Sequence, residues 1–98
     1  ADTSCFEEGK LALELGCDLI GTTMCGYTPY TKGEAIPAFK LIERYSKELS
    51  ATVIAEGGIW YPEQLVKAYE SGAFSCVVGT AITRPRDITR RFVSYLNK

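Results

Sequence analysis

The sequence predicts an α/β fold in which parallel strands alternate with helices. Two short apolar runs, Val53-Ile54-Ala55-Glu56-Gly57-Gly58 and Val77-Val78-Gly79-Thr80-Ala81, end in glycine turns and are separated by one segment with helical spacing. Short β-branched runs joined through an amphipathic helix are typical of a parallel sheet. The units ending in Gly-Cys-Asp-Leu-Ile and Gly-Ala-Phe-Ser-Cys-Val-Val are similar, which indicates that the pattern of helix and strand repeats.

The composition argues against several classes of protein. The 98 residues carry 11 basic and 12 acidic side chains, a net charge of -1, so no nucleic-acid surface is expected. No apolar stretch approaches the roughly 20 residues that span a bilayer, and no signal-peptide pattern is present. The chain has no histidine and no CxxC pair, which argues against a zinc site. We therefore expect one small cytoplasmic domain without metal, nucleic-acid or membrane partners.

The expected elements follow from periodicity and from end signals. Asp2-Thr3-Ser4 followed by Glu7 has the form of a helix cap, and Pro62 is typical of a first helical turn. Met24–Ile36 holds glycines, a proline and two tyrosines without periodicity, which predicts a long loop. Helices are expected over Cys5–Leu15, Pro37–Leu49, Pro62 to the Ser71-Gly72 pair, and Asp87–Asn97, and strands over Cys17–Thr23, Thr52–Glu56 and Phe74–Val78.

These elements form four βα units, the first beginning at the end of a strand, and four such units make half of a (βα)8 barrel. A doubly wound open sheet is the alternative, although no GxGxxG turn follows any strand. Because the chain opens without Met and where a strand should finish, we expect a fragment of a longer protein. Right-handed crossovers place all strand carboxyl ends on one face, so one neighbourhood should contain Asp2, Thr22, Thr23, Glu56 and Gly79.

Glu56 is the main candidate for chemistry, because it is a carboxylate at the end of an otherwise apolar strand. Without histidine, only acidic, Lys, Tyr or Cys side chains could transfer protons. The bare amides of the glycine turns can face an anion, which together with Glu56 would suit a phosphosugar enzyme. Two simpler interpretations stay open: Glu56 could accept hydrogen bonds from amides or pair with Arg84, and the glycines could serve positive φ alone.

Four segments of the chain are informative together: Ala1-Asp2-Thr3-Ser4, Gly21-Thr22-Thr23 with Gly26-Tyr27-Thr28, Val53-Ile54-Ala55-Glu56-Gly57, and Gly79-Thr80-Ala81-Ile82-Thr83-Arg84-Pro85. In this order and spacing they resemble the C-terminal half of the N-acetylmannosamine-6-phosphate 2-epimerase family. The resemblance covers essentially the whole chain. It implies that residues 1–98 are the last four βα units of a TIM barrel, the first strand truncated.

The resemblance also implies an activity. The family consists of isomerases of amino-sugar and sialic acid catabolism, which interconvert N-acetylmannosamine 6-phosphate and N-acetylglucosamine 6-phosphate. They remove and return the proton at C2, with no metal or organic cofactor. A small-molecule sugar phosphate is therefore the expected partner of the site.

The resemblance assigns roles to three side chains. Glu56 matches a catalytic glutamate, Asp2 a substrate-contacting aspartate, and Arg84 the arginine that holds the phosphate. The family's lysine has no counterpart in residues 1–98, so this chain alone is expected to be inactive. Since the last two βα loops form a phosphate site in many barrels, the cradle beside Arg84 is expected at Gly57, Gly58, Gly79 and Thr80.

Two other functions are alternatives. Another phosphate-binding barrel, a synthase or isomerase with different chemistry, would use the same glycine turns for the same anion. A half-barrel could instead be a non-catalytic assembly module, because its open strand edges and apolar inner face favour association. We expect the chain to self-associate or to dock onto a missing N-terminal half.

Overall fold

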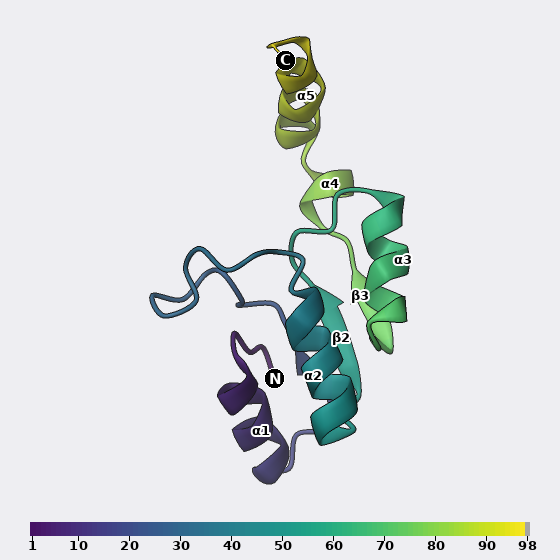
Figure 1. Cartoon of the computed structure of the whole chain (residues 1–98). Coiled ribbons are helices and arrows are strands. Elements are labelled where there is room, and N and C mark those ends of the chain that lie inside the picture. The colour runs from purple at the N-terminus through teal and green to yellow at the C-terminus, as the bar shows by residue number, and fades with distance from the viewer. Residues whose placement is uncertain (98) are drawn as a thin grey trace.

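The structure, a computed structural model, describes residues 1–97, and in this part of the chain helices and strands alternate from α1 to α4 (Figure 1). In order, the elements are α1 (Phe6–Glu14), β1 (Ile20–Gly21), α2 (Phe39–Leu49), β2 (Val53–Glu56), α3 (Pro62–Glu70), β3 (Ser75–Val77), α4 (Thr80–Thr83), α5 (Pro85–Ser94) and the 3-10 turn η1 (Tyr95–Asn97).

The strands form one parallel sheet in the order β1-β2-β3. Ile20 pairs with Val53 in the first strand pair, and Ile54 pairs with Ser75 in the second. Asp2 forms an isolated parallel bridge with Gly21, so a further segment extends the sheet beside β1. Each segment lies beside its neighbour in the sequence, which confirms the predicted alternation of parallel strands and helices.

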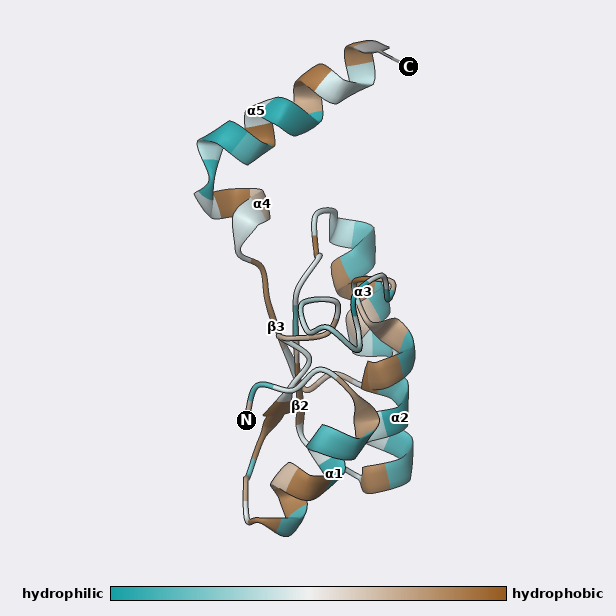
Figure 2. Ribbon diagram, turned by 90° about the vertical axis from the view of Figure 1, so that its left-hand side faces the viewer, coloured by the Kyte–Doolittle hydropathy of each residue, from teal (hydrophilic) through white to brown (hydrophobic). Residues whose placement is uncertain are grey.

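Helices α1, α2 and α3 cover one face of the sheet, and the other face is open over the described residues (Figure 2). Successive side chains of a strand point to opposite faces. Val53 and Ala55 of β2 are buried, whereas Ile54 and Glu56 are only partly buried. Val53 and Ala55 therefore face the helices, and Glu56 belongs to the open face.

Tyr45 of α2 is the largest fully buried side chain of the core in the described residues. Its side chain is fully buried, and its hydroxyl oxygen lies 2.7 Å from Thr3 Oγ1 and 2.6 Å from the Cys5 carbonyl oxygen. A Cβ on Gly9 would stand 2.4 Å from the Tyr45 ring, so the glycine lets α1 approach α2 closely. The other residues of the buried apolar cluster that contains Tyr45 are Ile20, Ile42, Val53, Ala55, Ala68 and Ala73.

The burial of Tyr45 predicts how stability depends on pH. Desolvation raises the pKa of Tyr45 from 10.0 to about 12, because burial disfavours the phenolate. The raised pKa contributes its full stabilisation below pH 10, where Tyr45 is protonated in both states. Between pH 10 and 12 the unfolded chain loses the proton that the folded chain keeps, so the free energy of unfolding falls. In urea unfolding between pH 10 and 12, the free energy of unfolding should fall less steeply with pH for Tyr45→Phe than for the parent. Equal declines in both proteins would contradict the prediction.

The structure differs from the expected elements in several places. β1 is limited to Ile20–Gly21 rather than Cys17–Thr23, because beyond Gly21 a side chain, that of Thr22, takes over the contacts with β2. The last helix begins at Pro85, whose fixed φ suits a first helical position, and ends in a 3-10 turn. The one-turn helix α4 was not predicted, because it is too short to show a helical repeat.

The chain leaves apolar surface uncovered at both ends. Helix α5 extends away from the sheet (Figure 1), and its Phe92 is 68% exposed. At the other end, Leu11 of α1 and Leu15 just after it are 54% and 77% exposed, whereas Phe6 and other α1 residues pack against the core. No helix in residues 1–97 combines the length and apolar character needed to cross a bilayer.

Candidate active site

A pocket of about 430 Å³ lies where the three strands end. Glu56 is the last residue of β2, Val77 is the last residue of β3, and Thr23 closely follows β1. Because parallel strands with helical crossovers end at the same edge of the sheet, their loops meet in one place. The pocket is lined by Thr23, Tyr27, Ile36, Glu56, Gly57, Gly58, Ile59, Trp60, Val77, Gly79 and Thr80.

The partly buried Glu56 side chain lines this pocket. Its backbone is bound by Thr22, whose Oγ1 accepts a hydrogen bond from the Glu56 amide and donates one to the Glu56 carbonyl oxygen, each at 3.1 Å. Within residues 1–97 its carboxylate forms no hydrogen bond or ion pair, so neither an amide cap nor a pair with Arg84 is found. The carboxylate is available to a bound molecule.

The turn after β2 requires glycine. Gly57 and Gly58 have φ values of +110° and +76°, which residues with a side chain rarely adopt. A Cβ on Gly58 would also stand 3.0 Å from Ile36 in the long loop. The turn therefore lies directly against the loop, and the Gly58 amide donates to no backbone acceptor in residues 1–97.

The turn after β3 leads into the one-turn helix α4. Gly79 has a φ of -109° and open space around its ideal Cβ, so the positive-φ explanation considered for this glycine is wrong. Its carbonyl oxygen accepts hydrogen bonds from the amides of Ile82 and Thr83 at 2.9 and 3.0 Å, whereas the Gly79 and Thr80 amides donate to no backbone acceptor in the described chain. Amides at the start of a short helix are donors that barrel phosphate sites use.

Asp2 joins the site through Thr23. Its bridge with Gly21 places it beside β1, and its Oδ1 accepts a hydrogen bond of 2.8 Å from Thr23 Oγ1. Thr23 is itself part of the pocket wall. The expected neighbourhood is therefore confirmed as a spatial arrangement of Asp2, Thr22, Thr23, Glu56 and Gly79.

Asp2 is not the cap of the first helix. The N-cap residue of α1 is Cys5, and Glu8 reaches back so that its Oε1 accepts hydrogen bonds from the Ser4 amide at 2.7 Å and from Ser4 Oγ at 2.6 Å. Hydrogen bonds from Ser4 and from the Tyr30 hydroxyl lower the pKa of the Glu8 carboxyl. The interpretation of Asp2 as a cap is wrong, and its carboxylate points to Thr23 instead.

Arg84 does not line the pocket. It is exposed, follows the last residue of α4 and precedes Pro85, the first residue of α5. The single turn of α4 separates it from Thr80 by about 6 Å of helix rise, so its side chain starts from the same loop as the second glycine turn. The structure thus brings together Glu56 and the two glycine turns, and Asp2 is connected to them through Thr23. Arg84 lies outside the pocket, directly after α4.

Sequence reasoning missed parts of the pocket wall. Ile36 comes from the end of the long loop, and no local pattern shows that this loop folds back onto Gly58. Trp60 also lines the pocket, and Arg91 of α5 donates to its carbonyl oxygen at 3.0 Å. Tyr27, from the same long loop, also lies in the wall.

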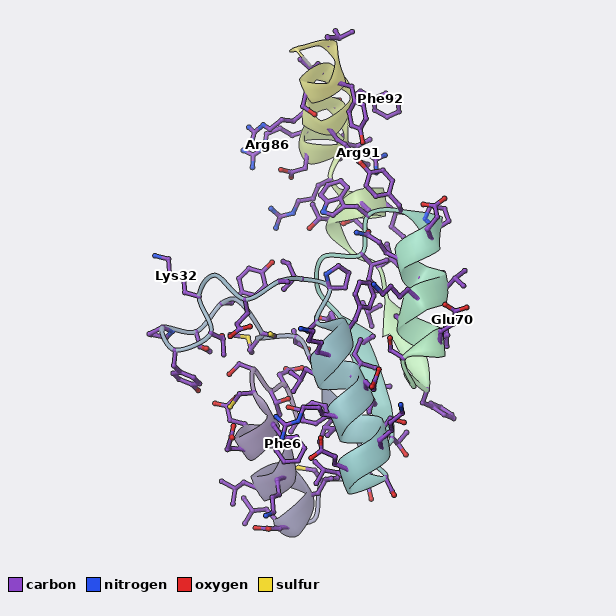
Figure 3. The ribbon with its side chains drawn as sticks, viewed as in Figure 1. Phe6, Lys32, Glu70, Arg86, Arg91 and Phe92 are labelled. Carbon is purple, nitrogen blue, oxygen red and sulfur yellow. The ribbon has the colours of Figure 1, made fainter. Side chains whose placement is uncertain are left out.

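Among the lining residues Glu56 is the only acid, and none of them is a lysine. Lys32 lies at the outer end of the long loop, away from the strands (Figure 3). No group of three or more His, Cys, Asp or Glu side chains within residues 1–97 is placed to hold a metal ion. The wall can therefore supply one carboxylate for proton transfer and several backbone amides for an anion.

Residues 1–98 match the protein family described as "Putative N-acetylmannosamine-6-phosphate epimerase". The chain belongs to this family. A relative from Caldanaerobacter subterraneus subsp. tengcongensis is 53% identical over 98 residues, which are 100% of this chain and 41% of that protein. One from Clostridium perfringens is 50% identical over 96 residues, 98% of this chain and 43% of its own length. Both relatives are named "Putative N-acetylmannosamine-6-phosphate 2-epimerase".

A solved structure of a family member has the same fold over nearly the whole chain. The N-acetylmannosamine-6-phosphate 2-epimerase from Clostridium perfringens matches with a TM-score of 0.92 and 49% sequence identity, covering 97% of this chain and 42% of that one. The parallel strands and helices described above thus correspond to part of the family's structure. The chain spans less than half the length of the relatives it matches.

Proposed function

We propose that residues 1–98 are the C-terminal half of a TIM-barrel N-acetylmannosamine-6-phosphate 2-epimerase acting in amino-sugar and sialic acid catabolism. Family membership supports the reaction class. The observation that carries the proposal for this chain is the unpaired Glu56 carboxylate in one pocket with Gly58, Gly79 and Thr80, whose amides have no backbone acceptor in residues 1–97. An acid-base group beside an anion cradle is what a sugar phosphate isomerase requires.

The two glycine turns support a position at the end of the barrel. TIM barrels frequently bind phosphate with the loops after strands seven and eight and with the N-terminus of a short extra helix. Here the turns after β2 and β3 share one pocket, and the one-turn helix α4 follows the second of them. In this proposal β2 and β3 are strands seven and eight, and Asp2 ends strand five.

In the proposed reaction Glu56 exchanges a proton with C2 of the sugar phosphate. Because C2 lies beside the C1 carbonyl, loss of this proton places negative charge on the C1 oxygen, which the site must stabilise. The proton returns to the opposite face of C2, and the configuration inverts. Asp2 contacts the sugar, and the phosphate is held by Gly57, Gly58, Gly79, Thr80 and Arg84.

Inversion at C2 needs a second proton-transfer group on the other face of the carbon. The family resemblance implies a lysine, and no lysine lines the pocket formed by residues 1–97. We propose that this lysine belongs to the part of the full-length protein that precedes these residues. The full-length protein should therefore epimerise its substrate, whereas the 98-residue chain alone should not.

A coupled assay with each epimer tests this proposal. The full-length protein and the 98-residue chain are each supplied with N-acetylmannosamine 6-phosphate, the formation of N-acetylglucosamine 6-phosphate is followed, and the reverse reaction is measured in the same way. Turnover in both directions by the full-length protein alone is the expected result. Turnover of neither epimer would overturn the proposal, and phosphate binding without turnover would favour a different phosphate-binding barrel enzyme.

The isolated 98-residue chain is expected to self-associate. The sheet face opposite the helices is open in Figure 2, and Val77 of β3, which alternation places on this face, is 41% exposed. Exposed apolar patches of this kind favour association. Static light scattering over a range of concentrations should give masses above that of one chain. One species with the mass of a single chain at every concentration would contradict this prediction.

A further inference from the structure

Thr22 holds the backbone of Glu56 at two points. Its side chain is buried, with 2% exposed, and its Oγ1 lies 3.1 Å from both the amide nitrogen and the carbonyl oxygen of Glu56. The Thr22 amide also donates to the Ile54 carbonyl oxygen at 3.2 Å. One residue that follows β1 is therefore bound to β2 at both Ile54 and Glu56.

This side chain replaces the hydrogen-bond ladder of the sheet. The pairing of β1 with β2 ends at Gly21 and Ile54, two residues before Glu56. Buried backbone amides and carbonyls need partners, and here the Thr22 hydroxyl serves one of each. Because these groups flank the Glu56 Cα, the two hydrogen bonds restrict the backbone torsions that set the direction of its side chain.

We infer that Thr22 is a positioning residue for the epimerisation, an inference that rests on the proposed function. The Glu56 carboxylate has no hydrogen-bond or ion-pair partner within residues 1–97, so its direction is set by its backbone and by packing. A proton-transfer group must come within hydrogen-bonding distance of the carbon-bound proton, and a misplacement of about 1 Å can cost roughly 10²-fold in rate. The Thr22 hydroxyl supplies this precision.

A purely structural role would have a different signature, and Thr3 provides the comparison. Thr3 is also a buried threonine, with 3% exposed, and its Oγ1 donates to the Gly21 carbonyl oxygen at 2.7 Å. It contacts β1 and Tyr45 but not Glu56. Replacement of either threonine by valine removes a buried hydroxyl, and only the change at Thr22 removes contacts with Glu56.

The test uses Thr22→Val, Thr22→Ser and Thr3→Val in the full-length protein. Thr22→Val should lower kcat by about 10-fold to 100-fold and change KM by less than about twofold, whereas Thr22→Ser should stay within about threefold of the parent. Thr3→Val should lower the unfolding midpoint and leave kcat within about twofold. If Thr22→Val does not fold, Thr22→Ala takes its place. Parental kcat in a folded Thr22 variant without the hydroxyl would overturn the inference.

A double variant shows whether Thr22 acts through Glu56. Adding Thr22→Val to Glu56→Gln should cause little further loss of rate, because the group being positioned is already disabled. If Thr22→Val lowers the rate of Glu56→Gln by as large a factor as it lowers the rate of the parent, the inference is overturned.

A crystal structure of Thr22→Val gives a readout that does not depend on turnover. The Glu56 carboxylate should be displaced in this variant, and an unchanged carboxylate would overturn the positioning role. An inactive parent in which this displacement occurs would contradict the proposed function and leave the positioning role supported.

Discussion

Glu56→Gln in the full-length protein is expected to lower kcat by about 10²-fold to 10⁴-fold, the usual contribution of a positioned proton-transfer group. Glutamine keeps the shape of the side chain but cannot accept and return the C2 proton. KM should change little, because the phosphate cradle is intact. The measurement is steady-state epimerisation of N-acetylmannosamine 6-phosphate, together with exchange of the C2 hydrogen with deuterated solvent.

Glu70→Gln is the matched control for this substitution. Glu70 is exposed at the end of α3, it does not line the pocket, and its side chain points outward from that helix in Figure 3. The same change of charge there should leave kcat within about twofold of the parent, as is usual for exposed positions. A Glu56→Gln variant that behaved like Glu70→Gln would remove Glu56 from the mechanism.

Arg84→Ala is expected to raise KM about 10-fold to 100-fold, which corresponds to the loss of a charge-assisted hydrogen bond of about 1.5–3 kcal/mol. The guanidinium is proposed to extend from the end of α4 toward the phosphate held by the amides of Gly79 and Thr80. The effect on kcat should be smaller, although remote binding energy can also support the chemical step. Competitive inhibition by inorganic phosphate should weaken in parallel with substrate binding.

Arg86→Ala and Arg84→Lys separate the site effect from a general effect of charge. Arg86 lies two residues further on, in α5, and its side chain extends outward in Figure 3. Its replacement should leave KM within about twofold, whereas Arg84→Lys should recover only part of the affinity because lysine cannot form a bidentate contact. If Arg84→Ala binds substrate as tightly as the parent, Arg84 does not hold the phosphate.

Elements with strong local signals were predictable from the sequence. β2 was expected over Thr52–Glu56 and is found at Val53–Glu56, because its apolar run stops at two glycines. α3 begins at Pro62 as expected, since proline fits the first helical position. The grouping of Glu56 with Gly79 followed from the same reasoning, because strand ends meet once the strands are known to be parallel.

Features that depend on contacts between distant residues were not predictable. The length of β1 depends on a side chain, that of Thr22, which binds a residue 34 positions away. The local sequence suggested that Asp2 caps a helix. Its actual partner, Thr23, lies 21 residues further along the chain, where no local signal could indicate it. Ile36 reaches the pocket because the long loop folds back on Gly58. No periodicity or end signal encodes such pairings.

The strands lie in the sheet in the same order in which a ribosome would synthesise them: Asp2, β1, β2 and β3. Among these segments, each strand pairs with one that was made shortly before it. Short separations between contacting residues favour rapid folding, and growing chains fold from the N-terminal side. A nascent chain of this kind can therefore add one unit at a time onto an already ordered edge.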